Sequence, residues 1–280
     1  MSAQILPLNP FQNVVASGVA ICDLRNLFGY TVERIILQLG GGALTKAMLT
    51  GIQLKANGKV IFDSTGPATD SRMQFRGITA NAAFLTIDFL ELKARSKLGL
   101  MGGALDTTLG IKDLRLEVTI AGATTPTLLG YAEVSTPQTG AEYAFMRPLI
   151  ARVHRLTQTI GGAGTFPIVV PHLDPNSGGS LFKRLAIFSA NATGVRVERN
   201  GIREWEVNST AANNFNQVEY LRVSQASLFV VDFVLDGIFE DRVLDTRPGG
   251  RTTTANVFGT FSGAETITIE AEVMEPLDVY

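Results

Sequence analysis

The sequence predicts an all-β protein made of two tandem copies of one antiparallel β-module. Three observations support this prediction: short strand-like runs dominate the chain, turn-forming clusters separate them, and the runs recur in the same order about half a chain apart. The chain has 280 residues, which is enough for two domains of ordinary size. A copy of roughly 140 residues would bury about two-thirds of its unfolded surface.

The strand prediction rests on short runs rich in β-branched and aromatic residues. Clusters such as STGPAT and DPNSGG separate these runs and have the composition of turns. The predicted strands are residues 32–39, 84–90, 113–120, 181–188, 227–235 and 265–273.

Helical patterns are few. Residues 44–49 and 69–75 could each form one short helix, and residues 141–156 carry apolar residues at helical spacing. Pro148 argues against an unbroken helix in that last segment. It could instead be a bent linker that leads into a strand.

Five runs in the first half resemble five runs in the second half, in the same order. Strands resemble one another, so each match alone is weak, but random strands would not keep this order. The matching order predicts a duplication, with domains at residues 1–147 and 148–280 and a linker at about 141–156. The pairs are residues 17–24 with 164–171, 32–39 with 182–189, 52–62 with 195–205, 84–91 with 228–235, and 113–120 with 265–272.

An Asn-Gly pair stands at the same place in each copy, as Asn57-Gly58 and as Asn200-Gly201. A two-residue type I′ turn needs a positive φ at both positions, which Asn followed by Gly tolerates best. The two pairs therefore predict structural hairpin turns and not a ligand site.

Asp88 and Asp232 lie inside apolar strands at matched positions of the two copies. Side chains alternate along a strand, so each aspartate faces away from its apolar neighbours. Three interpretations stay open: a solvated outer face, a contact with a neighbouring barrel or subunit, and a cation site.

The composition excludes several classes of function. The formal net charge is −2, so the total shows no strongly basic face for nucleic acid. Cys22 is the only cysteine, which rules out an intramolecular disulfide and suggests a buried apolar filler. His154 and His172 are the only histidines, too few for a cupin-type metal enzyme, and we expect them to have surface or packing roles.

Motifs of catalysis are also missing. GGGALTK at residues 40–46 lacks the glycine that a phosphate loop has before its lysine, and GGAGTF at residues 161–166 lacks the spacing of a dinucleotide fingerprint. No nucleophile elbow is found. The sequence therefore predicts a protein that is not an enzyme.

The ends and the hydropathy predict a soluble protein made in the cytoplasm. No apolar run reaches the ~18 residues that span a bilayer. The N-terminus does not resemble a secretory signal. Pro7 and Pro10 suggest that the first 13 residues or so form an extended arm outside the barrel.

Two stretches in each copy resemble a known family. VERIILQL with LTKAMLTGIQLKANGKVI in the first copy, and LFKRLAIFSANATGVRVERNGIREW with LFVVDFVLDGIFEDRVLD in the second, resemble double jelly-roll major capsid proteins of icosahedral bacteriophages with an internal membrane. The resemblance is nearest to the corticovirus-like proteins and more distant to the tectivirus-like ones. It covers most of residues 14–275 and implies two tandem eight-stranded antiparallel jelly-roll barrels.

The resemblance also implies a function. Such proteins form homotrimers, and three chains with two barrels each make a six-lobed, pseudo-hexameric capsomer of the virion. The implied partners are neighbouring capsomers, vertex proteins, minor membrane-associated capsid proteins and the internal lipid membrane, without specific nucleic-acid binding. No cofactor is implied except a structural calcium ion that cannot be assigned to residues. We expect the N-terminal arm to contact a neighbouring capsomer or the membrane side.

Two other functions compete with this one. A receptor- or carbohydrate-binding spike could use two β-sandwiches, but the only tryptophan, Trp205, lies in a predicted core strand and matches Phe62, which disfavours sugar stacking. A glycosidase needs paired carboxylates in a cleft. Glu240 and Asp241 are adjacent and would point to opposite faces of a strand, although another pair could exist.

Overall fold

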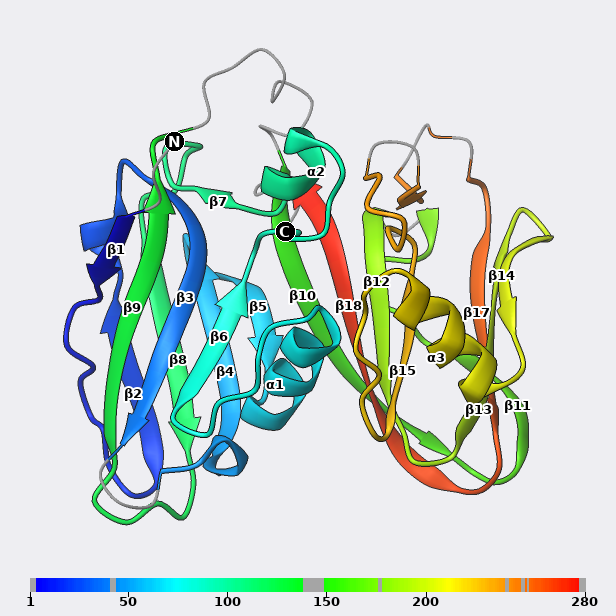
Figure 1. The fold of residues 1–280 in the computed structure, drawn as a ribbon, viewed down its shortest axis with the longest axis horizontal. Helices are drawn as coiled ribbons and strands as arrows, with labels where there is room; N and C mark the ends of the chain where they lie inside the picture. The colour runs from blue at the N-terminus through cyan, green and yellow to red at the C-terminus, as the bar shows by residue number, and fades with distance from the viewer. Residues whose placement is uncertain are drawn as a thin grey trace.

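The chain folds into two β-barrels that stand side by side, the first from the N-terminal half and the second from the C-terminal half (Figure 1). No helix among the described residues is long and apolar enough to cross a membrane. The computed structural model describes residues 4–40, 44–137, 149–175, 178–239, 242–247, 250 and 252–276.

Within the described residues, nine strands form the first barrel. They are β1 (Gln4–Pro7), β2 (Gly18–Asp23), β3 (Thr31–Gly40), β4 (Leu49–Ala56), β5 (Lys59–Ser64), β6 (Phe84–Asp88), β7 (Leu105–Asp106), β8 (Leu114–Ile120) and β9 (Thr127–Ser135). The helices of this half are α1 (Gly66–Phe75) and α2 (Lys97–Met101), with 3-10 turns at Arg25–Leu27 and Lys46–Met48.

Nine strands also form the second barrel. They are β10 (Leu149–Ile160), β11 (Gly164–Ile168), β12 (Leu181–Phe188), β13 (Ala192–Arg199), β14 (Ile202–Val207), β15 (Leu228–Asp232), β16 (Leu244–Asp245), β17 (Ala255–Phe261) and β18 (Glu265–Pro276). The described part of this half contains one helix, α3 (Thr210–Glu219).

The two barrels have the same topology. The first contains the sheets β1-β9-β3-β6 and β2-β8-β4-β5, and the second contains β10-β18-β12-β15 and β11-β17-β13-β14. The short β7 and β16 pair with β3 and β12, where they continue β6 and β15. Counting each interrupted strand once gives eight strands in the jelly-roll order, so the predicted fold class is confirmed.

The equivalence extends to single residues. Arg34 on β3 faces Asp88 on β6 and Glu133 on β9. In the second barrel, Arg184 on β12 faces Asp232 on β15 and Glu272 on β18. The register of β3 and of β12 shifts at the residue immediately before each arginine, so even the β-bulge is repeated.

One sheet is continuous across the two barrels. Its order is β15-β12-β18-β10-β5-β4-β8-β2, and the halves join where β10 lies parallel to β5. A single bridge, Val153 with Phe62, makes this join. The barrels are therefore connected by side chains much more than by backbone hydrogen bonds.

Each barrel has its own hydrophobic core. The first includes Ile35, Leu54 and Leu116, and the second includes Leu185, Val197 and Ile269, all fully buried. Cys22 is buried in the first core, as predicted, and its burial raises the pKa of the thiol to about 12. A thiol with such a pKa stays protonated and inert at neutral pH.

The strand predictions agree with the structure, but one pairing of the repeat is wrong. Residues 113–120 correspond to β8, whose neighbours are β2 and β4. The strand with the equivalent neighbours in the second barrel is β17, not the β18 of residues 265–272. Alternating strands share one pattern, so the sequence alone could not tell which of two successive strands matched.

The helix predictions are confirmed only in part. Residues 69–75 lie in α1, where the Thr65 side chain accepts a hydrogen bond from the Ala68 N–H. Residues 44–49 give only a 3-10 turn before β4, and residues 149–156 form the first part of β10 and not a helix, while the linker at about 141–156 stays a prediction. Residues 141–148 lie outside the described part of the chain, and the prediction missed α3, which Ser209 caps.

The expected N-terminal arm is partly wrong. Residues 4–7 form β1, which pairs with β9 of the same barrel, and the Leu8 N–H donates to the Gly130 carbonyl. Proline is tolerated at an edge of a sheet, and Pro7 is the last residue of this edge strand. The segment from residue 4 is thus part of the first barrel and not a free extension.

The two Asn-Gly pairs form the two-residue turns between β4 and β5 and between β13 and β14. The φ angles are 50° and 77° at Asn57 and Gly58, and 53° and 75° at Asn200 and Gly201. Both positions of each turn therefore have the positive φ of a type I′ turn.

Each asparagine also holds its hairpin to a loop. The Lys112 N–H donates to Asn57 Oδ1 at 2.7 Å, and the Thr253 N–H donates to Asn200 Oδ1 at 2.7 Å. These loops precede β8 and β17, which are equivalent strands. The asparagines thus have a second structural role that the turn pattern did not predict.

Replacing Gly58 with valine should lower the free energy of unfolding by about 1–2 kcal/mol, because a branched side chain is strained at positive φ. Urea unfolding followed by circular dichroism measures this change. Gly161→Val is the matched control, since a Cβ there meets nothing within 4 Å and its φ is not positive. Equal midpoints for the two variants would show that the turn carries no strain.

Candidate functional site at the barrel junction

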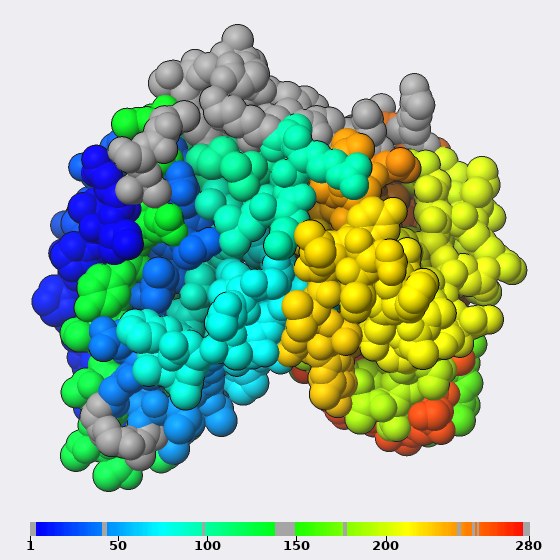
Figure 2. Space-filling model, viewed as in Figure 1, coloured from blue at the N-terminus to red at the C-terminus, as the bar shows by residue number. Residues whose placement is uncertain are grey.

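A cluster of buried charges lies between the barrels, where α1 and the segment after β6 cover the sheet β10-β18-β12. Figure 2 shows these cyan segments in contact with the yellow and orange part of the second half. Five basic and five acidic side chains form this junction cluster, and none is more than 7% exposed. They are Arg72, Arg76, Asp88 and Glu91 from the first barrel, and Lys183, Arg184, Arg222, Asp232, Glu270 and Glu272 from the second.

Arg184 is the centre of the junction cluster. Its Nη1 and Nη2 donate to the two carboxylate oxygens of Glu91, each at 2.7 Å, so a bidentate pair crosses the junction. Nη1 also donates to Glu272 Oε2 at 2.9 Å. Nε lies 3.0 Å from Asp232 Oδ2 as an ion pair without hydrogen-bond alignment.

These contacts keep the central groups charged. Burial disfavours the charged form of Arg184, but the carboxylates around it outweigh this effect and hold its pKa well above the usual value. Burial likewise disfavours ionised Glu91, yet Arg184, Arg76 and Lys183 hold its pKa well below the usual range. Arg184 and Glu91 are therefore both charged at neutral pH.

Helix α1 adds a second connection. Arg72 Nη1 donates to Glu272 Oε1 at 2.6 Å, and Arg72 Nε lies 2.6 Å from Glu270 Oε2 without hydrogen-bond alignment. The other oxygen of Glu270 accepts a hydrogen bond from Ser64 Oγ at 2.7 Å. The helix is thus held to β18 through both of the acidic residues that this strand presents to it.

An apolar seam lies next to these charges. Phe75 of α1 packs against Ala186, Leu228 and Val230 of the second barrel. Backbone contacts continue the seam, because the Val223 N–H donates to the Phe75 carbonyl and the Arg95 N–H donates to the Gly237 carbonyl. A Cβ on Gly237 would lie 2.7 Å from the Lys93 carbonyl oxygen, which explains why glycine occupies this position.

Both aspartates singled out in the sequence are buried, so the reading of a solvated outer face is wrong. Asp88 Oδ2 lies 3.5 Å from Arg34 Nη2 and 4.0 Å from Arg76 Nη2, all in the first barrel. Asp232 is the acceptor for Arg222 Nε at 3.0 Å and pairs with Arg184. Each aspartate pairs within its own barrel and reaches the other barrel only through its arginine.

Both aspartates also hold the turn that follows their strand. The Leu90 N–H donates to Asp88 Oδ1 at 3.0 Å, and the Val234 N–H donates to Asp232 Oδ1 at 3.1 Å. Arginines occupy the space that a bound cation would need beside these carboxylates. The arrangement favours a structural role over a cation site.

The sequence prediction missed the other members of the cluster. Arg184, Glu270 and Glu272 stand inside strongly apolar strands, which is the same signal that drew attention to Asp88 and Asp232. Their partners in the first barrel come from the segment after β6 and from α1, so no spacing rule along the chain relates them.

The two histidines lie together, which the sequence did not predict. Their ring centroids are 4.6 Å apart, and Glu275 lies beside them. Among the described residues, this is where three His, Cys or acidic side chains come close enough to hold a metal ion. The expectation of surface or packing roles does not conflict with this contact and stays a prediction.

Replacing Glu91 with alanine should destabilise the protein by about 3–5 kcal/mol, because it removes the bidentate partner of buried Arg184 and the ion-pair partner of buried Lys183. Thermal and urea unfolding measure the loss. Glu117→Ala is the matched control: Glu117 pairs with Lys55 at 2.7 Å where both side chains are about one-fifth exposed, so the loss should stay below about 1 kcal/mol. Similar losses would show that burial of the cluster is unimportant.

Comparisons with known proteins agree with this architecture. The family models of the viral coat protein P2 N-terminal and C-terminal domains match residues 5–135 and 150–277. No curated protein matches the sequence significantly.

Solved structures share the fold of both barrels at low sequence identity. The major capsid protein P2 from bacteriophage PM2 is 16% identical with a TM-score of 0.80, over 99% of this chain and 98% of that one. The STIV major capsid protein is 13% identical with a TM-score of 0.71, over 99% and 98% of the two chains. The Faustovirus major capsid protein is 7% identical with a TM-score of 0.62, over 98% and 90%.

None of these comparisons supports the spike alternative. The strand order, the duplicated register and the two matched domains all indicate a structural coat protein. The chain therefore belongs to the viral coat protein P2 family and is a major capsid protein of the virion.

Proposed function

We propose that this coat protein forms homotrimers in which three chains give a six-lobed, pseudo-hexameric capsomer of an icosahedral bacteriophage shell. One observation carries the proposal: a groove at the outer edge of the second barrel is lined in part by the positions equivalent to those that line the junction inside the chain. The junction and the groove then represent one interface, used within the chain and between chains.

Six lining positions of the junction have counterparts in the lining of the groove. In the first barrel Phe62, Arg76 and Phe89 face a small space beside Val153 of the second barrel. The groove of the second barrel is lined by the residues 143 or 144 positions later, Trp205, Tyr220 and Phe233 among them. Ile61, Arg72 and Asp88 have their counterparts in Glu204, Asn216 and Asp232.

The junction and the groove differ in whether another barrel fills them. Residues 151–153, 183 and 272–273 of the second barrel fill the space in the junction and leave a volume of about 30 Å³. In the groove no described residue takes that place, and a volume of about 360 Å³ is open. The indole Nε1 of Trp205 has no hydrogen-bond partner among the described residues.

The first barrel of a second copy has the surface that would fill the groove. Val153 of β10 faces Glu272 on β18, and Ile5 of β1 faces Glu133 on β9, so Ile5 is the counterpart of Val153. Ile5 is 68% exposed. Arg34 pairs with Glu133 at 3.3 Å, and this pair is equivalent to the Arg184–Glu272 pair. Within the chain, the second barrel does not cover the Arg34–Glu133 pair.

Helix α3 supports the same arrangement. It is the counterpart of α1, since α1 lies between β5 and β6, α3 lies between the equivalent strands β14 and β15, and the two helices differ by 144 positions. Phe75 of α1 is buried against the second barrel, whereas Phe215, Val218 and Leu221 at and after α3 are 70%, 52% and 64% exposed. An apolar patch of this kind is typical of a surface that binds a partner.

Repeating one head-to-tail contact generates a ring when the rotation closes. With two barrels per chain, three chains place six barrels around the ring, which is the six-lobed unit implied by the family resemblance. Neighbouring capsomers, vertex proteins, minor membrane-associated proteins and an internal lipid membrane are the further partners in this proposal.

Ile5→Asp and Phe215→Asp should each convert the trimer to monomers, lowering the trimer fraction at least tenfold. Both side chains are exposed in the single chain, so the fold should not change. Size-exclusion chromatography with light scattering gives the mass, and circular dichroism verifies the fold. Val19→Asp, at a residue 37% exposed on β2, is the control and should stay trimeric. A monomeric parent protein, or trimers of both variants, would contradict the proposal.

A further inference from the structure

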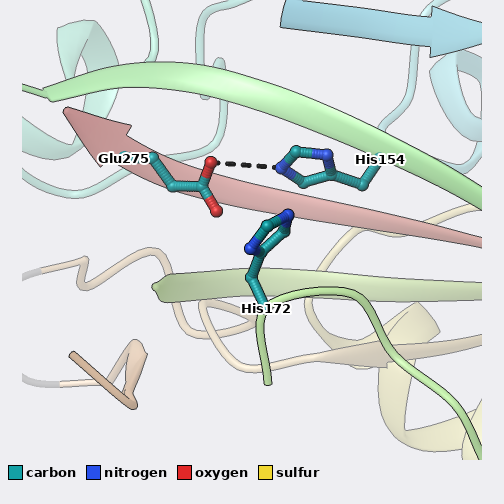
Figure 3. A group of neighbouring side chains, drawn as sticks. All are labelled: His154, His172 and Glu275. Carbon is teal, nitrogen blue, oxygen red and sulfur yellow. Dashed lines mark hydrogen bonds and ion pairs between the residues drawn. The ribbon is translucent and has the colours of Figure 1, made fainter. Parts of the chain in front are cut away.

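The second barrel contains a cluster of two imidazoles and one carboxylate that the coat function does not use. His154 comes from β10, His172 from the loop between β11 and β12, and Glu275 from the end of β18 (Figure 3). Residue alternation puts Glu275 on the face of β18 that also carries Ala271 and Val273 of the second core. The cluster therefore lies at one end of the barrel interior.

We propose that His154, His172 and Glu275 bind a divalent transition metal of the Zn²⁺ type. One donor atom from each side chain lies within 4.8 Å of the other two. Ligands of a tetrahedral zinc ion, at about 2.0–2.1 Å from the metal, lie about 3.3 Å apart, so small side-chain rotations would complete the site. Two imidazoles and one carboxylate leave a fourth position for water.

The donor set selects the class of metal. Imidazole nitrogen suits zinc, copper, cobalt and nickel, whereas calcium takes six to eight oxygen ligands. Glu275 alone supplies oxygen to this site, so the structural calcium implied by the family resemblance does not fit here.

The carboxylate is already held in position. Glu275 is 1% exposed, and one of its oxygens accepts a hydrogen bond from Ser180 Oγ. Its other oxygen, Oε2, lies 3.1 Å from His154 Nε2 and is the atom that faces the imidazoles. Supporting hydrogen bonds of this kind orient the ligands of metal sites.

Metal binding would move one hydrogen of His154. In the metal-free cluster this hydrogen lies between His154 Nε2 and Glu275 Oε2. When the metal binds, both of these atoms become ligands, and the neutral imidazole carries its proton on Nδ1. Arg152 Nε lies 3.5 Å from Oε2, and its positive charge opposes that of the metal. We therefore expect weaker binding than at a closed site of four protein ligands.

The position of the ligands predicts a structural effect. Two of them stand on the paired strands β10 and β18, and the third belongs to the loop that precedes β12. A bound metal would connect this loop to the sheet and stabilise the folded chain, because it binds only the native arrangement. This inference does not depend on the trimer, since all three ligands come from one chain.

Calorimetric titration of the EDTA-treated, dialysed full chain with ZnCl₂ tests the proposal. We expect one Zn²⁺ per chain, a higher melting temperature with Zn²⁺, and no displacement by excess Ca²⁺. His172→Asn keeps a residue that tolerates the φ of 58° found there, and it should weaken binding at least tenfold and abolish the thermal shift. Glu275→Gln should do the same, and Co²⁺ should give the visible spectrum of a four-coordinate site only in the parent protein.

Glu265→Gln is the matched control, because Glu265 stands at the other end of β18 and also accepts a hydrogen bond from a serine, Ser189. Its Zn²⁺ binding should equal that of the parent. Absence of saturable binding to the parent protein would overturn the proposal. So would equal affinity of the parent and His172→Asn, which would mean adventitious binding elsewhere on the surface.

Discussion

The bidentate pair between Arg184 and Glu91 is the interaction on which the arrangement of the two barrels depends. The shared sheet contributes little to this arrangement, because it crosses between the barrels at a single bridge. Removing ten charged groups from water costs much free energy, so the cluster is stable only when each group finds a partner of opposite sign. A shifted or rotated second barrel would leave some of these charges unpaired.

The need to pair every buried charge determines the orientation of the two barrels more than it adds to the stability of the chain. Buried ion pairs contribute little net free energy compared with apolar residues of similar volume, but a misplaced partner is costly. The apolar seam around Phe75 supplies the attraction, and the charges restrict its geometry. A shell subunit benefits from such a restriction, because a small error in the angle between two barrels would grow around a ring.

Duplication explains why the junction and the open groove are alike. The trio of Arg34, Asp88 and Glu133 has the same register as the trio of Arg184, Asp232 and Glu272. The second trio is covered by the first barrel within the chain and has Glu91 and Arg72 as additional partners. In the first trio Asp88 is buried, whereas Arg34 and Glu133 stay about one-fifth exposed on the face that we assign to the next chain.

The sequence predicted the strands, the hairpins and the duplication because these depend on local patterns that two copies repeat. It failed where strands resemble one another, as with β8 and β18, and where tertiary packing overrides a local signal, as with the strand at residues 149–156. Asp88 and Asp232 were recognised as unusual, yet their partners were not, since Glu91 and Arg184 meet from opposite halves of the chain. His154, His172 and Glu275 converge for the same reason, through folding and not through spacing.

Cysteine cross-linking tests most directly whether one interface serves both within and between chains. Ile5→Cys with Trp205→Cys in one chain should give, under oxidising conditions, covalent trimers on a non-reducing gel, and Phe62→Cys with Val153→Cys should give a link within the single chain. Buried Cys22 should not react. Monomers from the first variant, with a normal link in the second, would contradict the equivalence of groove and junction.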